Sequence, residues 1–198
     1  MRRPPLSRLR KLSPSFQTTD SSVKIKPLIL LAIIICAAVA AFLIFRPASV
    51  LKVNTIGSEA TDFDLSGVNK DTMKLSDMRG SVVLVNFWAT WCMSCVEEMP
   101  SLERLNRILS GNPHFKIVTI LYRDDLGRGV QYLKQNGYTF PVFINPDQTA
   151  ARLFGITGVP ETYIIDKKGV MRDKVIGPAD WDSPQVVSSL QALINEGP

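Results

Sequence analysis

The sequence is poor in metal-ligating side chains, with only three cysteines and one histidine among 198 residues. A structural zinc ion needs about four cysteine or histidine ligands. Cys92 and Cys95 form one closely spaced pair, but Cys36 lies in an apolar segment and His114 in a Gly-Asn-Pro-His turn. Because no second pair is present, we expect no metal site, and no motif points to a cofactor.

The sequence also lacks the aromatic residues interleaved with a basic patch that are typical of nucleic-acid binding. The formal net charge of +5 arises at the N-terminus. Residues 1–27 hold one acid, Asp20, and seven basic residues: Arg2, Arg3, Arg8, Arg10, Lys11, Lys24 and Lys26. Without them, 16 basic and 17 acidic residues remain in 28–198. The positive charge therefore indicates how the chain is oriented in a membrane, and we expect no nucleic-acid partner.

Residues 28–45 form a run of 18 residues without a charge. At about 1.5 Å per residue, a helix of this length reaches roughly 27 Å, close to the hydrocarbon thickness of a bilayer. The segment is apolar all round, which is not typical of a core helix in a small domain. The sequence therefore predicts a single transmembrane anchor over 28–45. Because the basic residues precede it, the positive-inside rule places the N-terminus in the cytoplasm.

A cleaved signal peptide is the alternative, since Ala38-Val39-Ala40 resembles a cleavage site. The region before it is unusually long, however, and the apolar run continues to Phe45. We therefore favour an uncleaved anchor, with 1–27 as a disordered basic tail, 46–54 as a linker and 55–198 as the folded domain. In a bacterium this domain then faces the periplasm or the outer side of the inner (cytoplasmic) membrane. Cys36 is a small apolar residue within the lipid.

Cys92 and Cys95 stand where a predicted strand turns into a predicted helix. Residues 82–88 are apolar and β-branched, and in 97–110 apolar residues recur at helical spacing. Free N–H groups and the dipole at a helix N-terminus stabilise a thiolate, and the i, i+3 spacing puts the second sulfur on the same face. Cys92 is therefore the expected nucleophile and Cys95 the resolving thiol. An inert disulfide is the alternative, but so short a bridge constrains little.

The residues around this pair resemble a known family. Similarity to the active-site strand and turn of thioredoxin-like proteins is carried by Val85-Asn86-Phe87-Trp88-Ala89-Thr90-Trp91-Cys92-x-x-Cys95. More narrowly, residues 57–198 resemble the membrane-anchored TlpA/ResA/CcmG group of bacterial thiol–disulfide oxidoreductases. The resemblance implies an α/β, thioredoxin-like fold with a mixed central sheet and helices on both faces. It also makes Trp91 part of the expected active site.

The rest of the domain is compatible with such a fold. Residues 57–80 predict a short hairpin followed by a helical turn. Further strands are predicted at 115–122, 142–144, 163–165 and 170–176, and further helices at 127–136, 149–154 and 186–194. Strands and helices thus alternate through most of the domain, which favours a sheet covered on both faces.

Two polar residues near the pair take their expected roles from the resemblance. Asn86 stands where thioredoxin itself carries a buried acid that accepts a proton from the second cysteine. An amide cannot take that role, so we expect Asn86 to be a hydrogen-bonded buried amide that holds the turn. Glu98 matches an acid that is frequent in the group, one turn past Cys95, and is a candidate for proton transfer. A solvated position on the helix surface is the alternative for Glu98.

A second motif is Gly158-Val159-Pro160-Glu161-Thr162. Pro160 matches the cis-proline that lies against the C-x-x-C motif in thioredoxin folds. The resemblance implies that Pro160 shapes the substrate groove and keeps metal away from the thiols, while the Val159 backbone is presented to an extended substrate. Glu161 follows as in CcmG-like proteins and is a candidate acid lining the groove.

The resemblance implies a membrane-tethered thiol–disulfide oxidoreductase, a reductant that keeps the haem-binding cysteines of apocytochrome c reduced during cytochrome c maturation. Electrons are expected from a membrane thiol transporter of the DsbD/CcdA kind. Met93-Ser94 departs from the proline-containing pair usual in the group, which leaves the direction of electron flow open.

Two other functions are weighed against this one. A thiol peroxidase of the peroxiredoxin type needs Pro-x-x-x-Thr-x-x-Cys, but Thr90 is two residues before Cys92 instead of three and position 85 is Val. A non-enzymatic copper chaperone would use Cys92, Cys95 and His114. Copper chaperones of this fold usually carry C-x-x-x-C, which is longer by one residue than the spacing found here.

Overall fold

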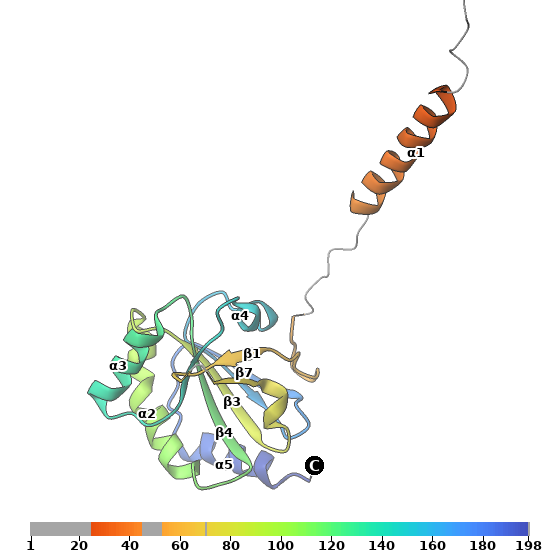
Figure 1. The fold of residues 1–198 in the computed structure, drawn as a ribbon. Coiled ribbons are helices and arrows are strands. Elements are labelled where there is room, and N and C mark those ends of the chain that lie inside the picture. Colours follow the sequence, from red (N-terminus) through yellow and green to blue (C-terminus); the bar gives the residue numbers. More distant parts are fainter. Residues whose placement is uncertain (1–24, 45–52, 70, 198) are drawn as a thin grey trace, which may run out of the picture. The chain divides into compact units, whose positions relative to one another are not determined.

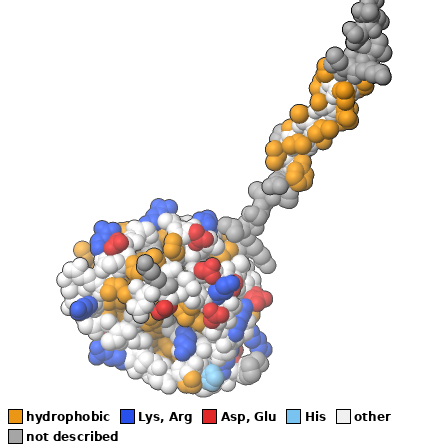
Figure 2. Space-filling model, in the orientation of Figure 1, with side chains coloured by type: hydrophobic (Ala, Val, Ile, Leu, Met, Phe, Trp, Pro, Cys, Tyr) orange, Lys and Arg blue, Asp and Glu red, His pale blue; other side chains and the backbone are white. Residues whose placement is uncertain are grey.

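A computed structural model describes residues 25–44, 53–69 and 71–197 (Figure 1). The chain divides into two units, 1–50 and 51–198. The first contains helix α1 (Ile25–Ile44), whose described side chains are apolar and exposed (Figure 2). Among the residues that the structure describes, no helix is both long and apolar enough to cross a membrane. Most of the predicted tail and residues 45–52, which include most of the predicted linker, lie outside the described residues.

The described part of the second unit is built on a seven-stranded mixed sheet in the order β2-β1-β5-β4-β3-β6-β7. Its strands are β1 (Asp64–Ser66), β2 (Thr72–Lys74), β3 (Val82–Trp88), β4 (Phe115–Leu121), β5 (Val142–Ile144), β6 (Glu161–Ile165) and β7 (Met171–Ile176). Strand β3 pairs in parallel with β4 and antiparallel with β6. It therefore lies in the interior of the sheet.

Helices cover both faces of this sheet, which confirms the predicted mixed sheet and layered architecture (Figure 1). One face packs against α2 (Met93–Leu109), α3 (Leu126–Asn136) and α5 (Pro184–Asn195). The other packs against the 3-10 helix η1 (Leu75–Met78) and α4 (Thr149–Leu153). Because successive side chains of a strand point to opposite faces, β3 contributes Leu84 and Trp88 to the first cluster and Val85 and Phe87 to the second.

Two boundaries differ from the predictions. Helix α2 begins at Met93, four residues before the predicted start, because Cys92 is its N-cap with an extended backbone. The predicted linker extends to residue 54, but Asn54 is buried and its N–H donates to the Leu153 carbonyl at 2.6 Å. The Asn54 side chain also accepts from the Thr61 N–H at 2.9 Å. Asn54 is therefore part of the folded unit.

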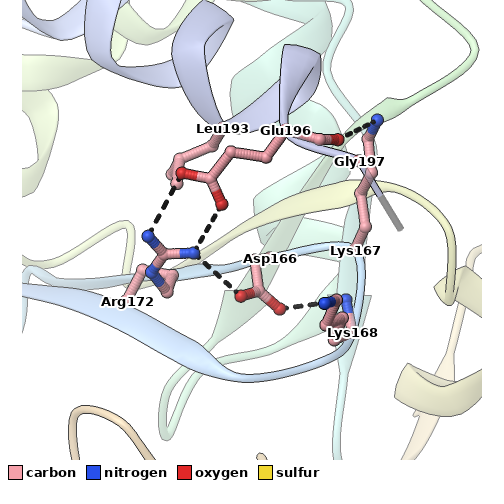
Figure 3. Close-up of a pocket in the computed structure, with 7 residues that line it drawn as sticks. All are labelled: Asp166, Lys167, Lys168, Arg172, Leu193, Glu196 and Gly197. Carbon is pink, nitrogen blue, oxygen red and sulfur yellow. Dashed lines mark hydrogen bonds and ion pairs between the residues drawn. The ribbon is translucent and has the colours of Figure 1, made fainter.

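Ion pairs and hydrogen bonds link the C-terminal end of α5 to the hairpin formed by β6 and β7 (Figure 3). Arg172 lies between two carboxylates, with Nη1 3.1 Å from Asp166 and 2.8 Å from Glu196. Lys167 Nζ donates to the Glu196 carbonyl at 3.0 Å. Asp166 and Lys167 follow the C-terminal end of β6, whereas Glu161 begins that strand. The length of β6 therefore separates this charged cluster from the loop that precedes the strand by roughly 16 Å.

A tight contact between α3 and β4 generates the first prediction. A Cβ added at Gly129 would lie 2.5 Å from Leu121 Cδ1, and Leu121 is itself buried. Overpacking of this kind costs about 1–3 kcal/mol, so Gly129→Ala is expected to lower the free energy of unfolding by about that amount in a urea titration. Gly111→Ala is the control, because nothing lies within 4 Å of its added Cβ. Equal stability of the two variants would refute the packing argument.

Candidate active site

Cys92 and Cys95 lie together at the N-terminus of α2 and are joined by a disulfide. Cys92 is the N-cap, and the Cys95 N–H donates to its sulfur at 3.1 Å. The two residues differ in exposure, because Cys92 is 6% exposed whereas Cys95 is fully buried. The structure thus places the Cys92 sulfur at the end of the helix where the N–H groups and the positive end of the dipole stabilise negative charge.

The turn before Cys92 is held by Asp124, which follows the end of β4. Asp124 Oδ2 accepts from the Thr90 N–H at 2.7 Å and from its hydroxyl at 2.6 Å. The Asp124 side chain is fully buried and pairs with Arg128 at 2.9 Å. Burial acts to raise the pKa of Asp124, but the hydrogen bonds from Thr90 and the charge of Arg128 outweigh it, and the pKa is lowered. Asp124 is therefore a fixed anion behind the turn.

Sequence reasoning did not find this role of Asp124. The neighbouring residue Asp125 is the N-cap of α3, and its side chain accepts from the Arg128 N–H at 3.0 Å. A signal for the role of Asp124 was nevertheless present in the topology. Strands β3 and β4 are parallel neighbours, so polar residues that follow them meet at the same edge of the sheet.

Trp91 stands beside the disulfide with its side chain largely in solvent, at 59% exposure. Its indole N–H lies 3.4 Å from the carbonyl oxygen of Arg123. Arg123 has φ of 50°, in the left-handed region that is uncommon for residues other than glycine. The segment after β4 thus contacts both Thr90 and Trp91.

The loop before β6 reaches the disulfide from the other side. The Val159-Pro160 peptide bond is cis, and the Val159 carbonyl oxygen lies 3.4 Å from Cys92 Sγ. The Gly177 N–H donates to the Pro160 carbonyl at 2.9 Å, which ties the loop to the end of β7. The structure therefore brings the Val159 carbonyl, which precedes the cis bond to Pro160, beside Cys92.

Glu98 lies buried one turn beyond Cys95 and not on a solvated helix surface. Its Oε1 accepts from Asn86 Nδ2 at 2.8 Å, and its Oε2 accepts from Trp181 Nε1 at 3.0 Å and the Ala179 N–H at 3.2 Å. Burial raises the pKa of Glu98 above its ordinary value, although these hydrogen bonds oppose the rise. A carboxyl with neutral partners and a raised pKa is suited to taking up and releasing a proton.

Asn86 is a fully buried amide that links three elements. From the middle of β3 it donates to Glu98 on α2 and to Thr162 Oγ1 on β6, each at 2.8 Å. Its carbonyl oxygen has no hydrogen-bond partner among the described residues. Trp181 and Thr162 complete this cluster, and the local sequence pattern around them gave no indication of it.

Glu161 does not line the groove as its place after Pro160 suggested. Its carboxylate accepts from Tyr163 on the same strand, at 2.6 Å, and pairs with Lys174 of β7 at 3.0 Å. Tyr163 belongs to the core cluster on one face of the sheet, and the two cysteines belong to the cluster on the other. Because residues two apart on a strand share a face, Glu161 points away from the disulfide.

His114 lies apart from the two cysteines within the folded unit. His114 Nδ1 lies 3.0 Å from the Gly80 carbonyl, at the start of β3, roughly 20 Å along that strand from the turn that leads to Cys92. Within the described ranges, no group of three or more His, Cys, Asp or Glu residues is arranged to hold a metal ion. Cys36 is a free, exposed cysteine of α1, in the other unit.

Known proteins are similar to this chain in sequence and in fold. Residues 56–174 match the model of the AhpC/TSA family. The chain is 34% identical to the thiol:disulfide interchange protein DsbE of Pseudomonas aeruginosa, over 86% of this chain and 97% of that protein. It is 31% identical to the thiol-disulfide oxidoreductase ResA of Geobacillus thermodenitrificans, over 62% of this chain and 70% of that protein.

A solved structure, a thiol:disulfide interchange protein of the thioredoxin family from Chlorobium tepidum, superposes with a TM-score of 0.60 at 25% identity. That comparison covers 70% of this chain and 99% of the other.

A mixed sheet that carries a C-x-x-C disulfide at the start of a helix, opposite a cis-proline, defines a thioredoxin-like thiol–disulfide oxidoreductase. The chain belongs to the AhpC/TSA family, and its relatives place it with the TlpA/ResA/CcmG group.

The contacts of Asp124 predict that Asp124→Ala destabilises the protein. The variant leaves the half-buried Thr90 N–H and hydroxyl without their acceptor, which costs about 1–3 kcal/mol in the free energy of unfolding, measured by urea titration. Arg128→Ala is the control, because it removes only the exposed partner and is expected to cost less than about 1 kcal/mol. If Arg128→Ala lowers the free energy of unfolding as much as Asp124→Ala does, the hydrogen bonds from Thr90 do not account for the contribution of Asp124 to stability.

The raised pKa of Glu98 predicts a pH dependence of stability. Between its ordinary value of 4.5 and the raised value, the folded state binds a proton that the unfolded state has lost, so stability falls as the pH rises through that window. Glu98→Gln removes this titration and should flatten the decline in a pH series of urea titrations. Glu97→Gln, at the exposed neighbouring position, should leave the decline unchanged. A wild-type decline that persists in Glu98→Gln would contradict the assignment.

Proposed function

We propose that this protein is a membrane-tethered reductant of disulfides outside the cytoplasm, with Cys92 as the nucleophile and Cys95 as the resolving thiol. The asymmetry of the pair carries the proposal. Cys92 is 6% exposed and its sulfur receives the Cys95 N–H, whereas Cys95 has no exposed surface. An external disulfide can therefore meet only the first sulfur, and the second can attack only a sulfur already bound there.

The reaction then proceeds in two exchanges. The Cys92 thiolate attacks one sulfur of the substrate disulfide, a mixed disulfide forms, and the other substrate sulfur leaves as a thiolate. Cys95 loses its proton and attacks Cys92 Sγ, which releases the second substrate sulfur and leaves the Cys92–Cys95 disulfide. Two electrons have passed to the substrate. The oxidised product is the state that the structure contains.

Glu98 is the proposed acceptor of the Cys95 proton. It follows Cys95 by three residues on the same helix, is buried, and has a raised pKa. Asn86, at the position of the acid in thioredoxin itself, holds the Glu98 carboxylate and takes no proton. The proposed proton acceptor thus lies on α2, the helix that begins at the two cysteines, and not on β3, the strand that carries Asn86.

Substrate is proposed to bind over Trp91 and along Val159. The exposed indole offers an apolar contact next to Cys92, and the Val159 backbone lies beside the attacking sulfur. An extended segment can therefore be held by main-chain hydrogen bonds while its disulfide faces Cys92. Pro160 gives this loop its shape and lacks an N–H of its own.

The resemblance to the TlpA/ResA/CcmG group supports apocytochrome c as the substrate, cytochrome c maturation as the process, and a membrane thiol transporter of the DsbD/CcdA kind as the electron donor. The uncharged run 28–45, preceded by basic residues, supports a single-pass anchor in the bacterial inner membrane, with the thioredoxin-like domain on the periplasmic side. The similarity to the Pseudomonas aeruginosa protein covers 86% of this chain, which exceeds the share occupied by residues 55–198 and so includes part of the N-terminal region.

The two alternatives receive less support. In a thiol peroxidase the threonine hydroxyl must face the reactive sulfur, but the Thr90 hydroxyl donates to Asp124. A copper chaperone would need His114 near the thiols, and that residue lies at the far end of β3.

The reduction potential of the Cys92/Cys95 couple tests the direction of the reaction. Equilibration of the full-length protein in thiol buffers, followed by alkylation, is expected to give about −270 mV or lower, as for thioredoxin. A value near about −120 mV, as for strong oxidants, would contradict a reducing role.

The order of attack is tested by trapping. Cys95→Ser should accumulate a mixed disulfide with a substrate that carries a disulfide, because Cys92 attacks but the second step is blocked. Cys92→Ser, the matched variant, should trap none, since Cys95 is buried. Mixed disulfides formed by Cys92→Ser at the same rate would reverse the assignment.

A further inference from the structure

Glu161 is a buried carboxylate with partners on three segments, although it contacts neither cysteine. It is 1% exposed. Oε2 accepts from the Tyr163 hydroxyl at 2.6 Å and pairs with Lys174 at 3.0 Å. Oε1 lies 3.2 Å from the Thr157 nitrogen and 3.4 Å from its hydroxyl oxygen, both of which donate to it. The carboxylate therefore joins β6, β7 and the loop 157–160.

The charge of Glu161 is stable in this setting. Burial acts to raise the pKa of the carboxyl, but the hydrogen bond from Tyr163 and the ion pair with Lys174 outweigh it, and the pKa is lowered. The group points to the face of the sheet away from the disulfide, where Tyr163 also contacts Phe154. A group so placed is not suited to exchange protons with the thiols.

The loop that Glu161 holds is the one that touches the nucleophile. Thr157 stands at its start, and Val159 presents its carbonyl oxygen 3.4 Å from Cys92 Sγ. The far end is tied by the Gly177 N–H to the Pro160 carbonyl. Glu161 thus holds the start of the loop at Thr157, and the Gly177 N–H holds its end at Pro160. The position of the Val159 carbonyl between them depends on both hydrogen bonds.

A carbonyl oxygen beside a sulfur acts on the two protonation states in opposite directions. It accepts a hydrogen bond from a thiol, and it repels a thiolate. At Cys92 the Cys95 N–H and the helix N-terminus favour the thiolate. The Val159 carbonyl oxygen acts against them, because it favours the thiol. The distance between the Val159 carbonyl and Cys92 Sγ therefore influences how much reactive thiolate is present at a given pH.

We propose that Glu161, paired with Lys174, is a positioning residue that sets the reactivity of Cys92 from the opposite face of the sheet, by holding the Val159 carbonyl against its sulfur. The inference rests on the proposed role of Cys92 as the nucleophile. It gives the acid after Pro160 a structural task in place of the groove-lining role that its sequence position suggested.

Two double variants separate position from charge. Glu161→Gln with Lys174→Met keeps an oxygen acceptor for Thr157, whereas Glu161→Val with Lys174→Met removes it. Both variants lose the same two charges, so any effect of charge through space is shared. Both also avoid an unpaired buried charge, and replacing a buried ion pair by apolar residues is often neutral for stability.

The measurement is the rate of Cys92 alkylation over a pH series, in the reduced full-length protein with Cys36→Ser and Cys95→Ser as background. The Val variant is expected to react about three- to tenfold faster than the Gln variant on the acidic side of the profile, with its midpoint moved toward acid, since losing one hydrogen bond to the thiol form shifts the balance by about that much. The Gln variant should follow the parent protein.

Asp166→Ala is the matched control for general loosening. Asp166 follows the other end of β6 and has comparable partners, because it accepts from the Lys168 and Val170 N–H groups, each at 2.9 Å, and pairs with Arg172 (Figure 3). Its loss should leave the alkylation profile unchanged even though it lowers stability.

Equal profiles for the Val and Gln variants would overturn the proposal, as would a shift of the same size in Asp166→Ala. The reduction of a disulfide substrate by the otherwise unmodified protein is measured separately. If that reaction is absent while the Val and Gln profiles differ, the proposed function fails and the positioning role of Glu161 stands.

Discussion

The burial of β3 on both faces is the constraint on which the rest of the structure depends. All seven residues of this strand are buried, between β4 and β6 in the sheet and between two helical layers. A strand held in this way has one register and one direction, so the turn at its end emerges at a fixed point. Cys92 is placed there as the N-cap of α2, and its reactivity follows from that position.

The loops around Cys92 are held by the neighbours of β3, and buried acids do the holding. Asp124 follows β4 and fixes the turn before Cys92, while Glu161 begins β6 and fixes the loop on the other side. Each is paired with a cation, Arg128 or Lys174, and each has a lowered pKa. Fixed negative charges of this kind position the backbone without taking part in proton exchange.

Glu98 is also buried, but its partners are neutral N–H donors from Asn86, Trp181 and Ala179. Its pKa is raised, because hydrogen bonds alone do not offset the cost of burying the charge. The balance between burial and hydrogen bonding thus separates the acids that hold the site, whose pKa is lowered, from the acid that is ready to exchange a proton, whose pKa is raised. This difference assigns roles to three carboxylates that look alike in the sequence.

The sequence by itself determined the strand at 82–88, the helix that follows, and the redox pair between them, because apolar periodicity and the C-x-x-C spacing are local signals. It also marked Val159 and Pro160 through their motif. The tertiary structure alone decided what Asp124, Glu161 and Trp181 do. Thr90 is 34 residues from Asp124, and Glu98 is 83 residues from Trp181, so these contacts arise only when the sheet brings distant segments together. The direction of the Glu161 side chain likewise depends on strand alternation, which a motif read along the chain does not reveal.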